Sequence, residues 1–218
     1  MMPDPPPIRP AADLADTVLA VQQSRRLLID TLKALSDFQD AITIDLIVPE
    51  AYAGPGRRAA RIAGQTSAAS RAVGLELAIW DRHRLPLASL DEPHTEIDAW
   101  VAGPAALLVA KAHKVHERLA QFATRPGRLR PKDSGDVGLL MMVTDPAEVA
   151  HVMATQSTQH PEIATVVADA ARWLVEMYAD PSSLLRQHAA DSLSIRFDDA
   201  EVTEKMATWL ETFTESLP

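Results

Sequence analysis

The order of apolar and polar positions along the chain changes at several points, and each change marks the limit of an expected element. Apolar residues recur at steps of three and four from Asp13 to about Phe38, which predicts an amphipathic helix. The run from Ile42 to Val48 is instead β-branched and apolar, which is typical of a buried strand, and Pro49 ends it. Glycines and prolines between Gly54 and Gly64 then indicate a loop with a short strand or turn inside it.

Strands and then helices follow this loop. Three further strands are expected, and with the first they form one small sheet: Leu75 to Trp80, Leu85 to Leu90 and Ile97 to Val101. Two helices follow, each with a proline at its start: Pro104 to about Phe122 and Lys132 to about Val143. From Asp145 onward the pattern is helical throughout, with breaks near Pro146, Pro161 and Pro181 and a last helix around Asp199 to Glu215.

This order of elements predicts an α+β fold, with a mixed sheet in the first half of the chain and a helical bundle in the second. Residues 1–12 are rich in proline and are expected to form a disordered tail. Residues 13–102 are expected to hold the first helix and a partial sheet, and residues 103–218 a helical subdomain.

Composition narrows the class of protein. The 218 residues contain no cysteine, which excludes disulfides, thiolate metal sites and a cysteine nucleophile, and fits a reducing cytoplasm. No apolar run approaches the roughly 20 residues that span a bilayer, and residues 1–10 carry prolines where a signal peptide would be apolar. We therefore expect a soluble, cytoplasmic protein without a membrane partner. The net charge of -9 argues against sequence-blind binding to nucleic acid.

That average charge conceals a strong segregation. Between Lys111 and Lys132 there are seven lysines or arginines and one acid, Glu117. A second basic stretch has no acid between Ala51 and Gly74 and contains Arg57, Arg58, Arg61 and Arg71. From Asp145 onward acids outnumber bases, so the two halves of the chain are expected to meet different partners.

Three features of the sequence carry candidate chemistry, and the first is a basic stripe on the helix after Pro104. Lys111, Lys114 and Arg118 lie on one side of this helix and border its apolar stripe. Cations held at the edge of a buried face are placed to grip a polyphosphate. The alternative is a solvated helix flank whose aliphatic stems cover apolar surface.

The other two features are carboxylates. Asp133 and Asp136 lie one turn apart in the first turns of the next helix, where acids also occur simply because they complement the helix dipole. Asp45 stands inside an apolar strand, where an unpaired charge costs several kcal/mol, so we expect it to face solvent or to meet a cation or a metal ion.

Histidines and tryptophans give weaker signals. His113 and His116 form a His-x-x-His pair without the glutamate of a zinc hydrolase, and we expect them at the surface. The four tryptophans are spread over different elements, which indicates core or interface positions rather than a base-stacking platform.

Taken in order, these segments resemble a known family. The later part of the nucleotidyltransferase domain of AbiEii-like type IV toxins, of the actinobacterial type, is similar to four segments of this chain. They are the run Ile44 to Ala51, the segment Gly74 to Ala78, the lysine-bearing helix with Lys111 and Lys114, and Lys132-Asp133-x-x-Asp136-Val137. The resemblance runs from about Ile42 to Met142, a little under half of the chain. In this family the site begins with a Gly-Ser turn followed by an Asp-x-Asp strand. This chain contains no Gly-Ser dipeptide and no Asp-x-Asp triplet.

The resemblance implies roles for particular residues. It implies a nucleotidyltransferase-like sheet in which Asp45 binds Mg²⁺, with Asp45, Lys111 and Asp133 as catalytic residues. The nucleotide would be bound by five residues: Lys111, Lys114, Arg118, Lys132 and Asp136. The acceptor backbone would be engaged by three arginines: Arg57, Arg58 and Arg61.

The function implied is that of a toxin that transfers a nucleoside monophosphate from an NTP to an RNA such as tRNA, or to a protein. The alternative is a catalytically degenerate nucleotidyltransferase fold that binds a nucleotide, an RNA or a partner. A third hypothesis is an interaction protein whose acidic half, Asp145 to Pro218, meets a basic partner such as a cognate antitoxin.

Overall fold

The computed structural model describes residues 46–53, 59–62, 65–88 and 96–218, and the chain divides into two compact units. The smaller unit takes in Met1–Ile47 and Ala53–Arg71, and the larger takes in Val48–Tyr52 and Ala72–Pro218. The helix expected from Asp13 to Phe38 lies outside the described residues. The expected domain limits at residues 12 and 102 stay a prediction.

The described residues of the smaller unit include β2 (Ala59–Ile62) and most of β3 (Gln65–Ala72), which belong to a three-stranded sheet. The strands of this sheet are β1 (Ile47–Pro49), β2 and β3, in the order β1-β3-β2. β2 and β3 are antiparallel, with Ala59 opposite Ser70, and the register shifts before Ile62. The strand expected from Ile42 to Val48 is therefore present at its end, whereas its residues 42–45 are outside the description.

From Ala72 onward, the larger unit runs through a tight turn and a two-stranded hairpin. β4 (Arg82–Ala88) and β5 (Glu96–Ala102) are antiparallel, with Arg82 opposite Ala102 and Ala88 opposite Glu96. The hairpin forms a sheet of its own, so the expectation of one sheet made from all the strands is wrong.

The strand predicted over Leu75 to Trp80 is also wrong, because the 3-10 helix η2 (Glu76–Ile79) occupies this segment. Gly74 precedes it with a φ of 94°, a conformation that favours glycine. The buried Glu76 carboxylate accepts a 2.7 Å hydrogen bond from the Gly74 N–H, which fixes the turn locally. The alternating apolar pattern of Leu75, Leu77 and Ile79 thus arises from a turn of helix.

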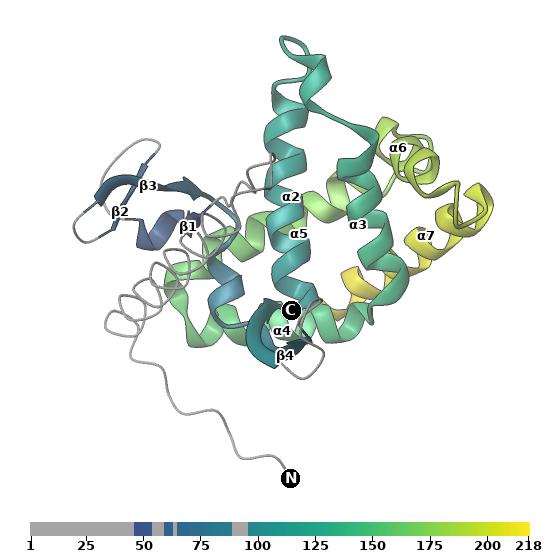
Figure 1. Ribbon diagram of the computed structural model, residues 1–218. Coiled ribbons are helices and arrows are strands. Elements are labelled where there is room, and N and C mark those ends of the chain that lie inside the picture. Colours follow the sequence, from purple (N-terminus) through teal and green to yellow (C-terminus); the bar gives the residue numbers. More distant parts are fainter. Residues whose placement is uncertain (1–45, 54–58, 63–64, 89–95) are drawn as a thin grey trace. The chain divides into compact units, whose positions relative to one another are not determined.

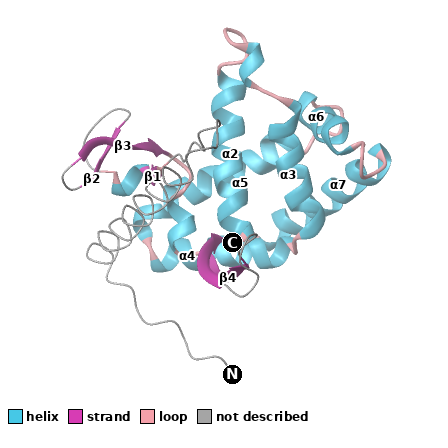
Figure 2. Cartoon of the chain, viewed as in Figure 1, coloured by secondary structure: helices cyan, strands magenta, loops and turns pink. Residues whose placement is uncertain are grey.

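The rest of the larger unit is helical, as the sequence predicts, and the α+β fold is confirmed (Figures 1 and 2). Its helices are α2 (Pro104–Ala120), α3 (Pro131–Val143), α4 (Pro146–Gln159), α5 (Ala164–Tyr178), α6 (Leu184–Leu193) and α7 (Asp199–Ser216). Proline occupies the first position of α2, α3 and α4, where its missing N–H costs nothing. Asp145, Ser183 and Asp198 cap α4, α6 and α7 with side-chain oxygens.

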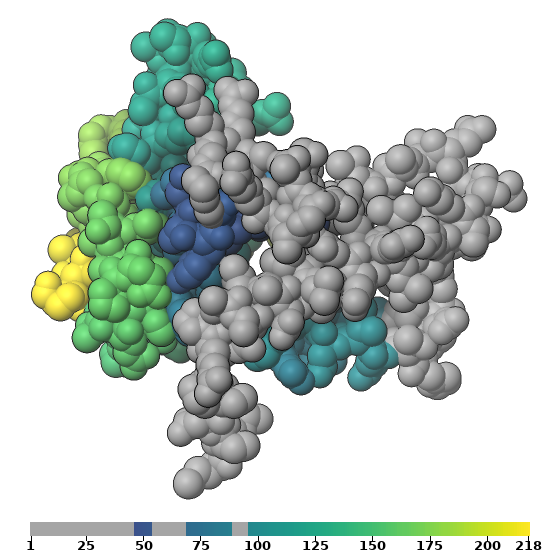
Figure 3. All heavy atoms as spheres, turned by 90° about the vertical axis from the view of Figure 1, so that its left-hand side faces the viewer, coloured from purple at the N-terminus to yellow at the C-terminus, as the bar shows by residue number. Residues whose placement is uncertain are grey.

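The hydrophobic core lies among these helices. α2 contributes fully buried Leu108, Val109, Ala112 and Val115, and packs against α3 and α5. α6 packs closely on α3, and α7 packs on α4 and α3. Figure 3 shows α4 and α5 as one continuous green surface of this unit. In the part of the chain that the structure describes, no single helix is long and apolar enough to cross a membrane, whereas α3 and α4 together, bent by 103°, meet the same length and composition test.

Candidate functional site

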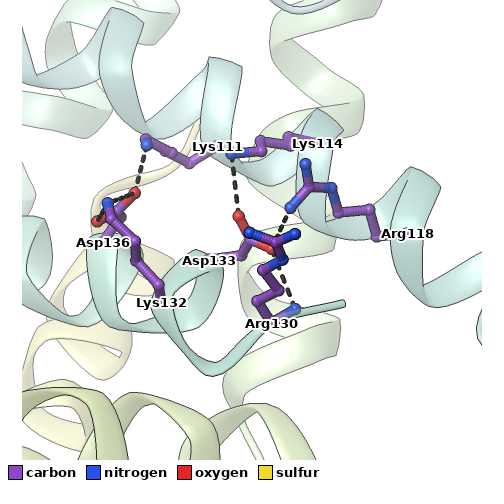
Figure 4. A network of polar contacts seen from close by, with 7 residues as sticks. All are labelled: Lys111, Lys114, Arg118, Arg130, Lys132, Asp133 and Asp136. Atoms are coloured by element: carbon purple, nitrogen blue, oxygen red, sulfur yellow. Dashed lines mark hydrogen bonds and ion pairs between the residues drawn. The ribbon is translucent and has the colours of Figure 1, made fainter. Parts of the chain in front are cut away.

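The predicted basic stripe of α2 faces the predicted acidic pair of α3. Lys111, Lys114 and Arg118 project from α2 toward Asp133 and Asp136 in the first turns of α3 (Figure 4). Both helices belong to the larger unit, and the buried apolar side of α2 sets the direction of the stripe. The sequence therefore predicted correctly that these cations border the core.

Asp133 is the centre of the site. Its side chain is 6% exposed and pairs with Lys114 at 2.9 Å and with the Arg118 guanidinium. It also accepts a 3.2 Å hydrogen bond from the backbone N–H of Arg130, the residue that precedes α3, and so closes the start of the helix. Burial on its own would raise the pKa of Asp133, but the hydrogen bonds from Lys114, Arg130 and Arg118 outweigh burial and lower it.

Asp136 lies one turn further along and has partners of its own. Lys111 Nζ donates to its carboxylate at 2.6 Å, and Lys132 Nζ at 3.0 Å. Burial would raise the pKa of Asp136, and the bonds from Lys111 and Lys132 reverse that effect and lower it. Both aspartates are therefore held as carboxylates by α2 cations.

A basic hollow of about 380 Å³ opens beside Asp133. Five basic side chains line it together with Gly127 and Asp133: Lys114, Arg118, Arg128, Arg130 and Lys132. Lys132 is 78% exposed and Arg128 reaches Glu117 at 3.5 Å across the surface. Asp133, Asp136 and Glu117 each pair with one or more of these five cations, so the cations outnumber the nearby carboxylates and the hollow is positive, in a chain that is negative overall.

Arg128 and Arg130 are residues that the sequence did not single out. Arg128 is the last residue of the 3-10 helix η3 (Pro126–Arg128), and Arg130 directly precedes α3. Both lie in the connection between α2 and α3, and both line the hollow. Their only signal in the sequence is membership of the basic run between Lys111 and Lys132.

The remaining predicted site residues belong to the smaller unit. Asp45, Arg57 and Arg58 lie outside the described residues, and Arg61 falls in β2. Their predicted roles in metal and acceptor binding stay predictions.

The resemblance places the Mg²⁺ ion at Asp45, which lies outside the described residues. Among the described residues, no three histidine, aspartate or glutamate side chains are arranged to hold a metal ion. The oxygens of Asp133 and Asp136 already receive bonds from four cations, so they do not offer Mg²⁺ an oxygen cage.

His113 and His116 are partly buried on α2 rather than free at the surface. His116 stacks on Trp173 of α5 with ring centroids 3.6 Å apart, and His113 meets the same ring edge-on at 4.9 Å. His113 Nε2 also lies 2.9 Å from the carbonyl oxygen of Val166. The pair therefore joins α2 to α5, and Trp173 is an interface residue, as expected.

Comparison of the chain with protein-family models, with curated proteins and with solved structures finds no match.

Proposed function

We propose that the basic hollow between α2 and α3 binds the phosphate groups of a nucleoside triphosphate. The observation that carries this proposal is the gathering of five cations beside Asp133 in a hollow of about 380 Å³. Three of the cations are arginines, whose planar guanidinium groups hold phosphate oxygens in bidentate fashion, and two are lysines, which act as point charges.

The ion pairs inside the site prepare it for an anion. Asp133 holds Lys114 and Arg118 in place, so their side chains lose less conformational freedom when a phosphate arrives. Each of these cations keeps donors beyond the bond it gives to Asp133. Lys132 and Arg130 lie at the exposed edge, where an incoming triphosphate meets them without breaking a buried contact.

The resemblance to AbiEii-like toxins extends this proposal to a reaction. The chain would transfer a nucleoside monophosphate from the bound NTP to an RNA such as tRNA, or to a protein, with Lys111 and Lys114 at the triphosphate and Arg57, Arg58 and Arg61 at the acceptor. Mg²⁺ held by Asp45 would supply neutralisation of phosphate charge. A cognate antitoxin would be the natural protein partner of such a toxin.

The second candidate is a nucleotide-binding module without transfer activity. It is favoured by the state of Asp133 and Asp136, whose carboxylates are engaged by lysines and an arginine instead of being open to a metal ion. In this case the hollow still binds phosphates, but binding does not depend on Mg²⁺.

One pair of assays separates these functions. Transfer from a radiolabelled NTP to bulk tRNA, in the presence of Mg²⁺, is compared between the unchanged chain, Asp45→Ala, Lys111→Ala and the surface control Arg172→Ala. Transfer that is lost in the first two variants and kept in the control supports the transferase, whereas transfer unchanged in both removes this site. If no transfer occurs, calorimetry that shows NTP binding without Mg²⁺ supports the binding module, and no binding at all contradicts the proposal.

A further inference from the structure

A second concave region, acidic where the hollow between α2 and α3 is basic, forms a groove between α7 and the junction of α3 with α4. It has a volume of about 630 Å³, and its lining includes Met141, Asp145, Glu201, Glu204, Lys205 and Trp209. The groove exists because α3 and α4 diverge by 103° at their junction while α7 packs across both.

The α7 side of the groove is a straight stripe. Its lining residues from Glu201 to Thr212 recur every three or four positions, so they lie on one side of the helix. At about 1.5 Å of rise per residue this side is roughly 16 Å long, which matches about three turns of a second helix.

The floor of the groove is apolar. Met141 and Trp209 form part of it and are almost fully buried, so the floor is continuous with the core. The Trp209 indole N–H donates to Thr144 Oγ1 at 3.2 Å, so this polar group already has a partner within the fold. Val143, 67% exposed at the end of α3, lines the smaller hollow described next.

The rim of the groove is acidic. Glu201, Glu204 and Asp145 line it, and the one lysine of the lining, Lys205, pairs with Glu201 at 2.9 Å. A smaller hollow of about 190 Å³ continues past Asp145 and adds Asp81 and Glu148, and no basic residue is among its lining residues.

Two of these five carboxylates already serve the fold. Asp145 Oδ1 accepts the N–H groups of Ala147 and Glu148, and Asp81 Oδ2 accepts the N–H of Ala106 at the start of α2. Helix dipoles offset their charge. Glu148 and Glu204, by contrast, form no ion pair with any basic side chain in the described ranges, so their charge is open to a partner.

We propose that this groove docks a basic, amphipathic segment of a partner protein, with its apolar side chains on the Met141–Trp209 floor and its lysines or arginines against the rim. Nucleic acid is excluded as the occupant because its phosphates would face the carboxylates. A second copy of this chain is the alternative occupant, and the experiment below distinguishes it from a partner segment. The inference does not depend on nucleotide binding.

The probes are three synthetic peptides of about 14 residues, long enough to follow the groove as a helix. The first has leucines and lysines at amphipathic spacing, the second replaces each lysine with glutamate, and the third replaces each leucine with serine. Binding of each labelled peptide to the full chain is measured by fluorescence anisotropy at low and at high salt.

We expect the leucine–lysine peptide to bind at least tenfold more tightly than either of the others, and more weakly at high salt. Glu201→Gln with Glu204→Gln lowers its affinity about tenfold. The matched control is Glu211→Gln with Glu215→Gln, which removes the same charge from exposed positions of α7 outside the groove and leaves affinity unchanged.

Three results would overturn the proposal. An equal loss in both double variants, or equal binding of the serine–lysine peptide, means that only general attraction to an acidic surface operates. Self-association that disappears in the Glu201→Gln, Glu204→Gln variant, without peptide binding, assigns the groove to a second copy. A titration with ATP in the same variant separates the two proposals, because it is expected to be unchanged whether or not the peptide binds.

Discussion

Asp133 shows how one side chain serves both the fold and the site. It closes the start of α3 through the Arg130 N–H, and it holds Lys114 and Arg118 of α2. Its place in the first turn was expected from the sequence, since acids there complement the helix dipole. Its contact with the two cations of α2 depends on how α2 packs against α3. The spacing of residues along the chain does not predict that packing.

Asp133→Asn is expected to destabilise the chain by about 2–3 kcal/mol. The change removes the buried charge that pairs with Lys114 and Arg118. Because both cations stay partly solvated, the loss of stability is smaller than is usual when one partner of a fully buried ion pair is removed. Equilibrium denaturation at neutral pH measures it. A loss no larger than that of the exposed control Asp169→Asn would show that the ion pairs add nothing to stability.

The same carboxylates make the stability of the chain sensitive to acid. The pKa values of Asp133 and Asp136 are lowered below their ordinary 3.8 in the folded chain, so their contribution is complete above that pH and is lost as the pH falls through the native values. Denaturation across this acidic range should show a shallower loss for Asp133→Asn than for the unchanged chain. Parallel curves would contradict the role given to Asp133.

At the scale of elements, helices were predicted well and strands poorly. Prolines at first positions and long apolar periodicity define α2 to α4 in the sequence alone. β3 was missed because Gln65–Ala72 is mostly alanine and serine, and Thr66 is its one residue of high strand propensity. η2 was mistaken for a strand because Gly74 and the Glu76 carboxylate make a local turn that an alternating pattern does not reveal.

The close packing of α3 against α6 requires the absence of a side chain at Gly135 of α3. A side-chain carbon at Gly135 would lie 2.3 Å from Ser192 Oγ and 2.5 Å from Ser192 Cβ. Gly135→Ala is therefore expected to destabilise the chain by about 1–3 kcal/mol, the usual cost of overpacking. Ser192→Gly in the same chain should restore part of the loss, measured as a double-mutant cycle. Additive effects of the two changes would contradict direct contact.

The contact of α2 with α5 is expected to weaken at mildly acidic pH. Burial lowers the pKa of His116 below 6.5, and the neighbouring charges of His113 and Arg172 lower it further. Glu176 and Asp169 act in the opposite direction and raise the pKa, but by less. The stability that follows from this shift is complete above pH 6.5 and is lost as the pH falls through the native value. His116→Phe keeps a ring on Trp173 and should show a smaller loss between about pH 7 and pH 5. An unchanged pH profile would exclude His116 as the group responsible.

At the scale of the whole molecule, opposite charges are collected at separate places on one helical unit. The basic hollow takes its cations from α2, η3 and the start of α3, whereas α7 and the start of α4 supply the acidic groove. The sequence predicted this segregation from the charge of its segments. It predicted Lys114, Arg118, Lys132 and Asp133 as site residues. It did not predict Arg128 and Arg130, because these residues lie in the connection between α2 and α3, and their neighbours are set by how the two helices pack.

Titration of ATP into the chain by calorimetry, at low salt and without Mg²⁺, tests the central claim most directly. Arg130→Gln with Lys132→Gln removes two exposed cations of the hollow, and Arg172→Gln with Arg196→Gln removes two exposed cations elsewhere. We expect the first variant to bind ATP about tenfold to a hundredfold more weakly, as for lost charge-assisted hydrogen bonds of about 1.5–3 kcal/mol. The second variant should bind like the unchanged chain. Equal affinities in all three proteins, or no binding of ATP to the unchanged chain, would contradict a phosphate site between α2 and α3.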